Sequence, residues 1–159
     1  MESRLLRISN ILVATDFSDC SRPALERGRD LAAAFGATLH VLHVVSPPPD
    51  DVWLAFAPAV SVAEHIEHLK QDATARLHDL AAADLAAGLR VVTATALGDP
   101  VDEILTYAGE QAIDLIVCGT HGRRGWTRAM MGSVAEHLVR VAPCPVFTIR
   151  ERAAQQPAA

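Results

Sequence analysis

The residue pattern with the most chemical content lies in the last third of the chain. Gly119 and Gly122 are separated by two residues, nine more residues follow, and Gly132 then stands directly before Ser133. Glycines let a backbone approach an anion closely, and the first turn of a helix offers unpaired N–H donors at its positive end. Because Ser133 opens an amphipathic stretch, the pattern favours a phosphate-binding site.

Charged side chains in the same loop add to this interpretation. Arg123 and Arg124 supply two guanidinium groups, and His121 lies between the glycines, where it could donate to a phosphate oxygen. Two glycines alone would indicate only a turn before a serine-capped helix, but their combination with the arginine pair favours an anion site. The pattern is neither a Walker A loop, which needs Gly-Lys-Ser/Thr, nor the dinucleotide fingerprint, which follows the first strand.

A second polar group follows the first apolar run. Thr15 and Asp16 come directly after the segment from Ile11 to Ala14, which has the pattern of a buried strand. A carboxylate at this place could bind a ribose hydroxyl or Mg²⁺. It could equally be a turn or N-cap aspartate before the next helix, and Thr15 is open to the same two interpretations.

Short apolar runs alternate with amphipathic stretches along the whole chain, which predicts an α/β fold. The expected architecture is a doubly wound, five-stranded parallel sheet sandwiched by four helices. Such sheets bind ligands beyond the carboxyl ends of the strands, where the strand order reverses. Strands are expected at 8–15, 38–45, 89–97, 113–118 and 146–149, and helices at 18–35, 62–88, from Asp99 and Pro100 onward, and at 133–141.

The glycine loop also carries a family resemblance. The segment GTHGRRGWTRAMMGSVAEHLVRVAPCPVFTIR, from Gly119 to Arg150, resembles the C-terminal signature of the universal stress protein family. The nucleotide-binding branch of that family carries Gly, two residues, Gly, nine residues, Gly and then Ser or Thr, a spacing that this chain fits without a gap. Because ILVATDFSDCS, LHVLHVV and GDPVDEIL also resemble family segments, the resemblance extends from Ile11 to Arg150.

The resemblance implies a Rossmann-like fold of the adenine nucleotide α-hydrolase type that binds ATP, with or without Mg²⁺. It implies that Asp16, the candidate Mg²⁺ ligand named above, lies near the ribose and phosphates, and that the backbone of Val44 meets the adenine edge. The other matched contacts, to phosphate and ribose, are Gly119, Gly122, Gly132, Ser133 and the N–H of Val134. His121 and Arg123 in the loop and Thr15 beside Asp16 complete the candidate binding set.

Two places depart from the family pattern or vary within it. Trp126 stands where a smaller aliphatic residue is expected, and it is predicted to cover the nucleotide or to rest on a partner subunit. Residues 46–60, with three successive prolines, Trp53 and Phe56, predict a long loop that could carry individual specificity. The resemblance further implies a homodimer joined through the strand at 146–149, since an apolar edge strand would otherwise stay unpaired.

Length and composition limit the possible functions. The 159 residues (17.0 kDa, net charge −5) fit a single domain over 1–150 with a flexible tail at 151–159. The acidic balance and the 4% aromatic content argue against nucleic-acid binding, and no apolar run reaches membrane-spanning length. Three widely spaced cysteines and an N-terminus without a signal-peptide pattern indicate the cytoplasm.

The resulting expectation is a stress-response module that binds ATP and signals through its conformation or through a protein partner. No catalytic residue is expected, because no positioned base accompanies the anion site. Two alternatives stay open, namely an interaction module of the same fold that binds no nucleotide, and a slow ATP-hydrolysing enzyme. His65 and His68 are predicted to lie on a solvated helix face, and His40 and His43 to be strand-edge or satisfied core residues on opposite faces of a strand.

Overall fold

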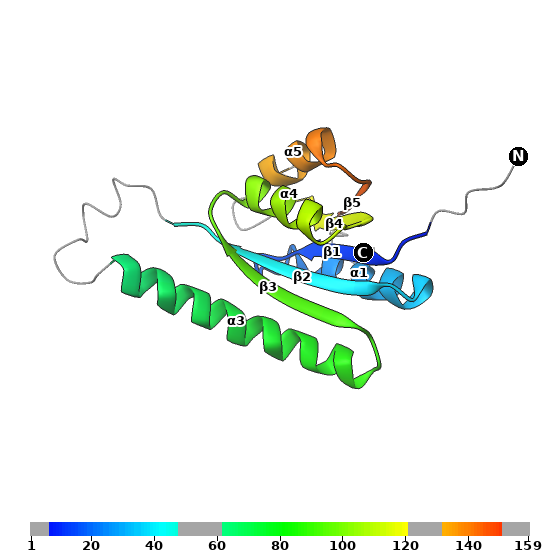
Figure 1. Ribbon diagram of the computed structural model, residues 1–159, viewed down its shortest axis with the longest axis horizontal. Coiled ribbons are helices and arrows are strands. Elements are labelled where there is room, and N and C mark those ends of the chain that lie inside the picture. The colour runs from blue at the N-terminus through cyan, green and yellow to red at the C-terminus, as the bar shows by residue number, and fades with distance from the viewer. Residues whose placement is uncertain (1–6, 48–61, 121–131, 151–159) are drawn as a thin grey trace, which may run out of the picture.

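The computed structural model describes residues 7–47, 62–120 and 132–150 (Figure 1). Within these ranges the sheet consists of β1 (Asn10–Ala14), β2 (Thr38–Val45), β3 (Val91–Leu97), β4 (Leu115–Gly119) and β5 (Val146–Ile149). The helices are α1 (Arg22–Phe35), α3 (Val62–Ala86), α4 (Pro100–Glu110) and α5 (Ser133–Val141).

The strands form one parallel sheet in the order β3-β2-β1-β4-β5. The chain therefore builds outward from β1 to β3, crosses back, and continues from β4 to β5 on the other side. Val13 of β1 pairs with Val41 of β2 on one side and with Val117 of β4 on the other. The predicted doubly wound α/β fold is confirmed, and its strand order reverses between β1 and β4.

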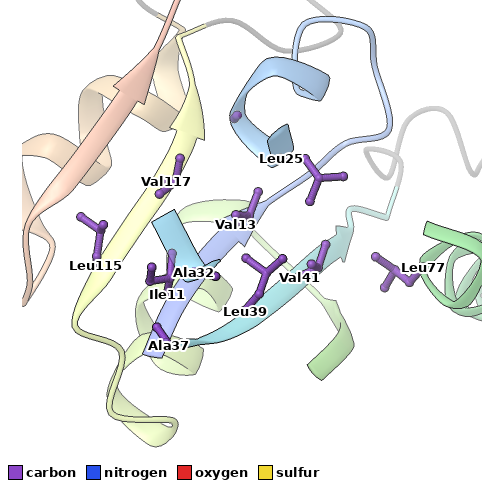
Figure 2. Packing of buried hydrophobic residues seen from close by; sticks show 11 residues of the cluster. Ile11, Val13, Leu25, Ala32, Ala37, Leu39, Val41, Leu77, Leu115 and Val117 are labelled. Atoms are coloured by element: carbon purple, nitrogen blue, oxygen red, sulfur yellow. The ribbon is translucent and has the colours of Figure 1, made fainter. Parts of the chain in front are cut away.

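Helices cover both faces of the sheet, with α1 and α3 on one face and α4 and α5 on the other (Figure 1). Alternate residues of β1 serve the two layers: Ile11 and Val13 pack toward α1 and α3, and Leu12 toward α4 and α5. Figure 2 shows the first layer, in which Leu25 of α1 and Leu77 of α3 belong to the same cluster of buried side chains. These side chains of β1, α1 and α3 are all buried, so both faces of the sheet are shielded from solvent at its centre.

Helix α1 lies very close to β1 because its inner face carries a glycine. A Cβ atom at Gly28 would overlap the side chain of Val13. On the outer side of this layer, Arg29 of α1 reaches Asp84 of α3, with Nε 2.7 Å from Oδ1, and its Nη2 donates to the carbonyl of Leu80 at 3.2 Å. Since Asp84 is only 7% exposed, this pair fixes the two helices to each other.

The ends of two helices differ in how closely they follow the sequence prediction. Helix α4 begins as expected, with the Asp99 side chain as its cap. Helix α1 begins at Arg22 rather than at residue 18, because the preceding residues form a turn in which Ser21 N–H donates to the Ser18 carbonyl. The apolar spacing along α1 would place Phe35 on the inner face of the helix, but it is 49% exposed, because it is the last residue before the left-handed Gly36 turns the chain toward β2.

Of the helices within the described residues, none combines the length and the apolar character needed to cross a membrane.

Candidate functional site

The reversal of strand order places the candidate site at the carboxyl ends of β1 and β4. These two strands are neighbours in the sheet, and the chain leaves them in opposite directions, to α1 on one face and to α5 on the other. The loops that follow such a pair of strands diverge and leave a crevice where ligands of this fold class bind. Thr15 and Asp16 follow β1, and Gly119 ends β4, so three predicted residues lie at this edge.

The residues after β1 form a closely bonded turn. Thr15 is 7% exposed, and its Oγ1 accepts from Phe17 N–H at 3.1 Å and lies 3.1 Å from Ser21 Oγ. The half-buried Asp16 repeats this pattern one residue later, since its Oδ1 accepts from Ser18 N–H at 3.0 Å and from Ser18 O–H at 2.5 Å. Both side chains thus shape the turn, and their contacts with a nucleotide stay predictions.

One residue of this turn has an uncommon backbone conformation. Phe17 has φ 61°, in the left-handed region that bulky residues rarely adopt. Its ring contacts His43 of β2, at 4.4 Å between ring centroids, and the guanidinium of Arg76 of α3, whose Cζ is 4.1 Å from the ring centroid. Sequence reasoning missed this arrangement, because no local signal in the chain brings residue 76 to residue 17.

A backbone hydrogen bond joins the end of β4 to the start of α5. Gly132 N–H donates to the carbonyl of Thr120 at 2.6 Å, which holds the start of α5 beside the end of the strand. Gly132 is itself the N-cap residue, and no side chain caps this described helix end. The prediction of Ser133 as the cap is therefore wrong: Ser133 is the first helical residue, because the extended backbone that a cap requires occurs at Gly132 (φ −63°, ψ 149°).

The first turn of α5 has backbone N–H groups without carbonyl partners inside the helix. The first N–H that reaches a carbonyl four residues back is that of Glu136, which donates to Gly132 O at 2.9 Å. The N–H groups of Ser133, Val134 and Ala135 therefore have no such partner within α5. Because Gly132 has no side chain, it supplies no oxygen to them, and the positive end of the helix faces the β4 edge uncovered by its own cap.

The third predicted contact, Val44, lies near the carboxyl end of β2. It pairs with Ala96 of β3, and its half-buried side chain packs toward the α4–α5 layer. His40 and His43 are on opposite faces of the same strand, as predicted, and both are satisfied core residues. His40 Nδ1 lies 3.0 Å from Tyr107 Oη, and His43 Nδ1 lies 2.8 Å from the Thr15 carbonyl.

Several predictions, including that of a flexible tail at 151–159, concern segments that the structure does not describe. His121, Gly122, Arg123 and Trp126 fall within 121–131, and the loop at 46–60 is described only at its first two residues. Their contacts stay predictions.

Two further titratable side chains of the described ranges have pKa values shifted by burial. Burial raises the pKa of Cys118 to about 11 and lowers that of His40, so both favour their neutral forms. No group of three or more His, Cys, Asp and Glu side chains that could hold a metal ion occurs among the described residues. As predicted, His65 and His68 are exposed on the surface of α3.

A surface groove of about 500 Å³ lies between α3 and β3 rather than at the switch point. It is lined by α3 residues and by Thr95 of β3, and it includes Lys70, the single lysine of the sequence. The groove is at the edge of the sheet, so it takes no part in the candidate site.

Comparisons with known proteins agree with this architecture. The universal stress protein MJ0531 of Methanocaldococcus jannaschii is 32% identical over 142 residues, which cover 89% of this chain and 81% of the relative. The solved structure of MJ0577, from the same organism, shares the fold with a TM-score of 0.80 at 22% identity, over 93% of this chain and 99% of that one. A universal stress protein in complex with cAMP has a TM-score of 0.66 at 26% identity, over 90% and 97%.

The match to a family model is equally extensive, because the model of the universal stress protein family covers residues 7–150. These residues contain the whole sheet and its helices, including both strands that bound the crevice. The chain therefore belongs to the universal stress protein family.

Proposed function

We propose that this protein binds an adenine nucleotide, ATP in the first place, in the crevice between β1 and β4. The phosphates lie at the first turn of α5, where the N–H groups of Ser133 and Val134 donate to them. The ribose lies toward Asp16, and the adenine edge meets the backbone at Val44. Gly119, Gly122, His121 and Arg123 complete the phosphate cradle, with Thr15 supporting Asp16.

The observation that carries this proposal is the start of α5. Its cap residue has no side chain, and the Gly132–Thr120 hydrogen bond fixes it at the end of a switch-point strand. A helix end of this kind favours negative charge by both its dipole and its unpaired N–H groups. The relative of known structure that binds cAMP supports an adenine nucleotide as the source of that charge.

Further parts of the proposal follow from the same site and from the sheet edge. When Mg²⁺ accompanies the nucleotide, Asp16 supplies the carboxylate oxygen, which is the ligand type that this cation prefers.

A second copy of the chain pairs at β5, an edge strand whose Phe147 is 46% exposed. The protein acts in the cytoplasm as a binding module whose nucleotide state selects a protein partner.

The test is to identify what the protein carries and what stabilises it. Mass spectrometry of small molecules released on denaturation should show an adenine nucleotide. Titration with Mg·ATP, AMP and cAMP should raise the melting temperature, because a ligand at about one hundred times its Kd adds about 2.7 kcal/mol to the free energy of unfolding. A protein that carries no nucleotide and shows no shift at millimolar ligand would contradict the proposal.

A further inference from the structure

The turn after β1 is held in an unfavourable backbone conformation by contacts from two distant elements. The left-handed φ of 61° at Phe17 is disfavoured for a residue with a large side chain. Such conformations persist where the surroundings over-determine them, and they occur most often at functional sites. The contacts that hold Phe17 are therefore informative about what the turn does.

Three interactions fix Phe17 in place. Its N–H donates to Thr15 Oγ1 at 3.1 Å, which closes the turn from within. One side of its ring lies against the imidazole of His43, tilted by 32°, and the guanidinium of Arg76 lies over the ring. We refer to Phe17, His43 and Arg76 as the aromatic clamp.

The aromatic clamp also contacts the backbone at the end of β1, where the turn begins. His43 Nδ1 lies 2.8 Å from the Thr15 carbonyl, so the residue that stacks on Phe17 also contacts the backbone where the turn begins. Between these two fixed points lies Asp16, whose Oδ1 bonds both donors of Ser18. The orientation of the Asp16 carboxylate is therefore set by a turn that is bonded at both ends.

We propose that Phe17 is a positioning residue, and that the aromatic clamp holds the turn at 15–18 in the conformation that presents Asp16 to the nucleotide. This inference rests on the proposed function for its nucleotide part. In this proposal α3 contributes to the site indirectly, because Arg76 acts on the ligand through the ring of Phe17. A clamp formed before binding raises affinity, since the turn need not be ordered when the nucleotide arrives.

The competing explanation is that Arg76 attracts the phosphates directly with its charge. A double-mutant cycle separates the two, because Arg76→Met removes the charge but keeps an apolar stem, and Phe17→Leu removes the aromatic face but keeps the charge. The matched control is Arg27→Met, since Arg27 is an exposed arginine of α1 that pairs with Asp30. Arg76 is itself on the exposed surface of α3, so its loss should leave the melting temperature nearly unchanged.

The affinity for Mg·ATP is measured by calorimetry for all variants. Arg76→Met should weaken binding by about two- to fivefold, the effect expected from an exposed cation–π contact. Phe17→Leu should weaken it by about five- to tenfold, because the turn must then be ordered on binding. In the Phe17→Leu background, Arg76→Met should have no further effect, and Arg27→Met should bind like the wild type. An equal loss from Arg76→Met in both backgrounds would overturn the inference.

The turn itself is followed by amide hydrogen exchange without nucleotide. The Phe17 and Ser18 amides should exchange faster in Arg76→Met and Phe17→Leu and unchanged in Arg27→Met, because their acceptors belong to the turn. Unchanged exchange would show that the clamp does not hold the turn. Faster exchange with wild-type affinity would show that the turn does not serve binding. A wild type that binds no nucleotide would overturn the proposed function, and the exchange data would still decide whether the clamp orders the turn.

Discussion

Helices α4 and α5 pack on the same face of the sheet and both begin at the carboxyl edge, yet their first turns are completed in opposite ways. Asp99 caps α4 with a carboxylate oxygen that accepts from Val101 N–H at 2.9 Å and from Asp102 N–H at 3.3 Å. Gly132 caps α5 with no side chain at all. The Asp99 carboxylate thus satisfies two backbone donors of α4, whereas the N-cap residue of α5 has no side chain that could do so.

Position in the sheet explains why the two ends differ. Helix α4 follows β3, which lies at the edge of the sheet, and α5 follows β4, which borders the reversal point. The first turn of α4 adds two acidic residues, Asp102 and Glu103, which further neutralise its positive end. Among the described residues, the helix that follows the edge strand is therefore capped by a side chain, whereas the N-cap residue of the helix beside the reversal point has none.

The largest effect is expected when the first turn of α5 is given a carboxylate cap like that of α4. Gly132→Asp should lower nucleotide affinity by about a hundredfold or more, because the new side chain occupies the N–H groups and repels phosphate. The backbone at 132 is in an extended conformation that any residue adopts. The melting temperature should therefore stay equal or rise slightly, since aspartate is a better cap than glycine. Calorimetry and thermal unfolding of one sample measure both effects, and a variant that still binds would refute the assigned phosphate position.

The converse change removes the side-chain cap of α4. Asp99→Ala should lower the free energy of unfolding by about 1 kcal/mol, the usual loss for an aspartate cap, and should leave nucleotide affinity unchanged. Denaturant unfolding measures the stability and calorimetry the affinity. A clear loss of affinity would show that the α4 end also belongs to the site and that the two helix ends do not differ in this respect.

A smaller test concerns the bulk of the cap rather than its charge. Gly132→Ala adds a methyl group without a hydrogen-bond acceptor, so nucleotide affinity should fall only several-fold, and stability by about 1 kcal/mol or less. The difference between the alanine and aspartate variants isolates the electrostatic part of the effect. If both variants lose affinity equally, crowding rather than charge excludes the phosphate.

The smallest effect is expected from the acidic first turn of α4. Asp102→Ala removes an exposed charge near the positive helix end, which should cost about 0.3–1 kcal/mol of stability at low salt. Because salt screens the dipole interaction, the difference from wild type should shrink as ionic strength rises. Unfolding curves at two salt concentrations measure this, and a difference independent of salt would point to another cause.

Much of the fold was predictable because its signals are local. The buried apolar run at 38–45 matches β2 residue for residue, and Asp99 followed by Pro100 marks the start of α4 correctly. Strand β4 begins at Leu115 rather than at Ile113, since strand ends depend on the neighbouring strand as much as on the run itself. Phe35 was misplaced because a periodic pattern does not show where a helix leaves the sheet.

The candidate site was predictable only in its outline. Gly132 and Ser133 were identified from their spacing, but which of them caps α5 depends on backbone angles that two small residues do not specify. The left-handed Phe17 lay beyond sequence reasoning, because the ring partners that hold it come from β2 and α3. Contacts between residues that are far apart in the chain produce no local sequence pattern from which they could be predicted.

The place of β1 in the middle of the sheet has a consequence for how the protein is made. One side of β1 pairs with β2, which follows soon after it, but the other side waits for β4, where Ile11 meets Leu115. During synthesis from the N-terminus, the half-sheet of β1, β2 and β3 with α1 and α3 can assemble first, with an apolar strand edge still bare. The central strand is therefore paired on both sides only after residues 115–117 have been synthesised.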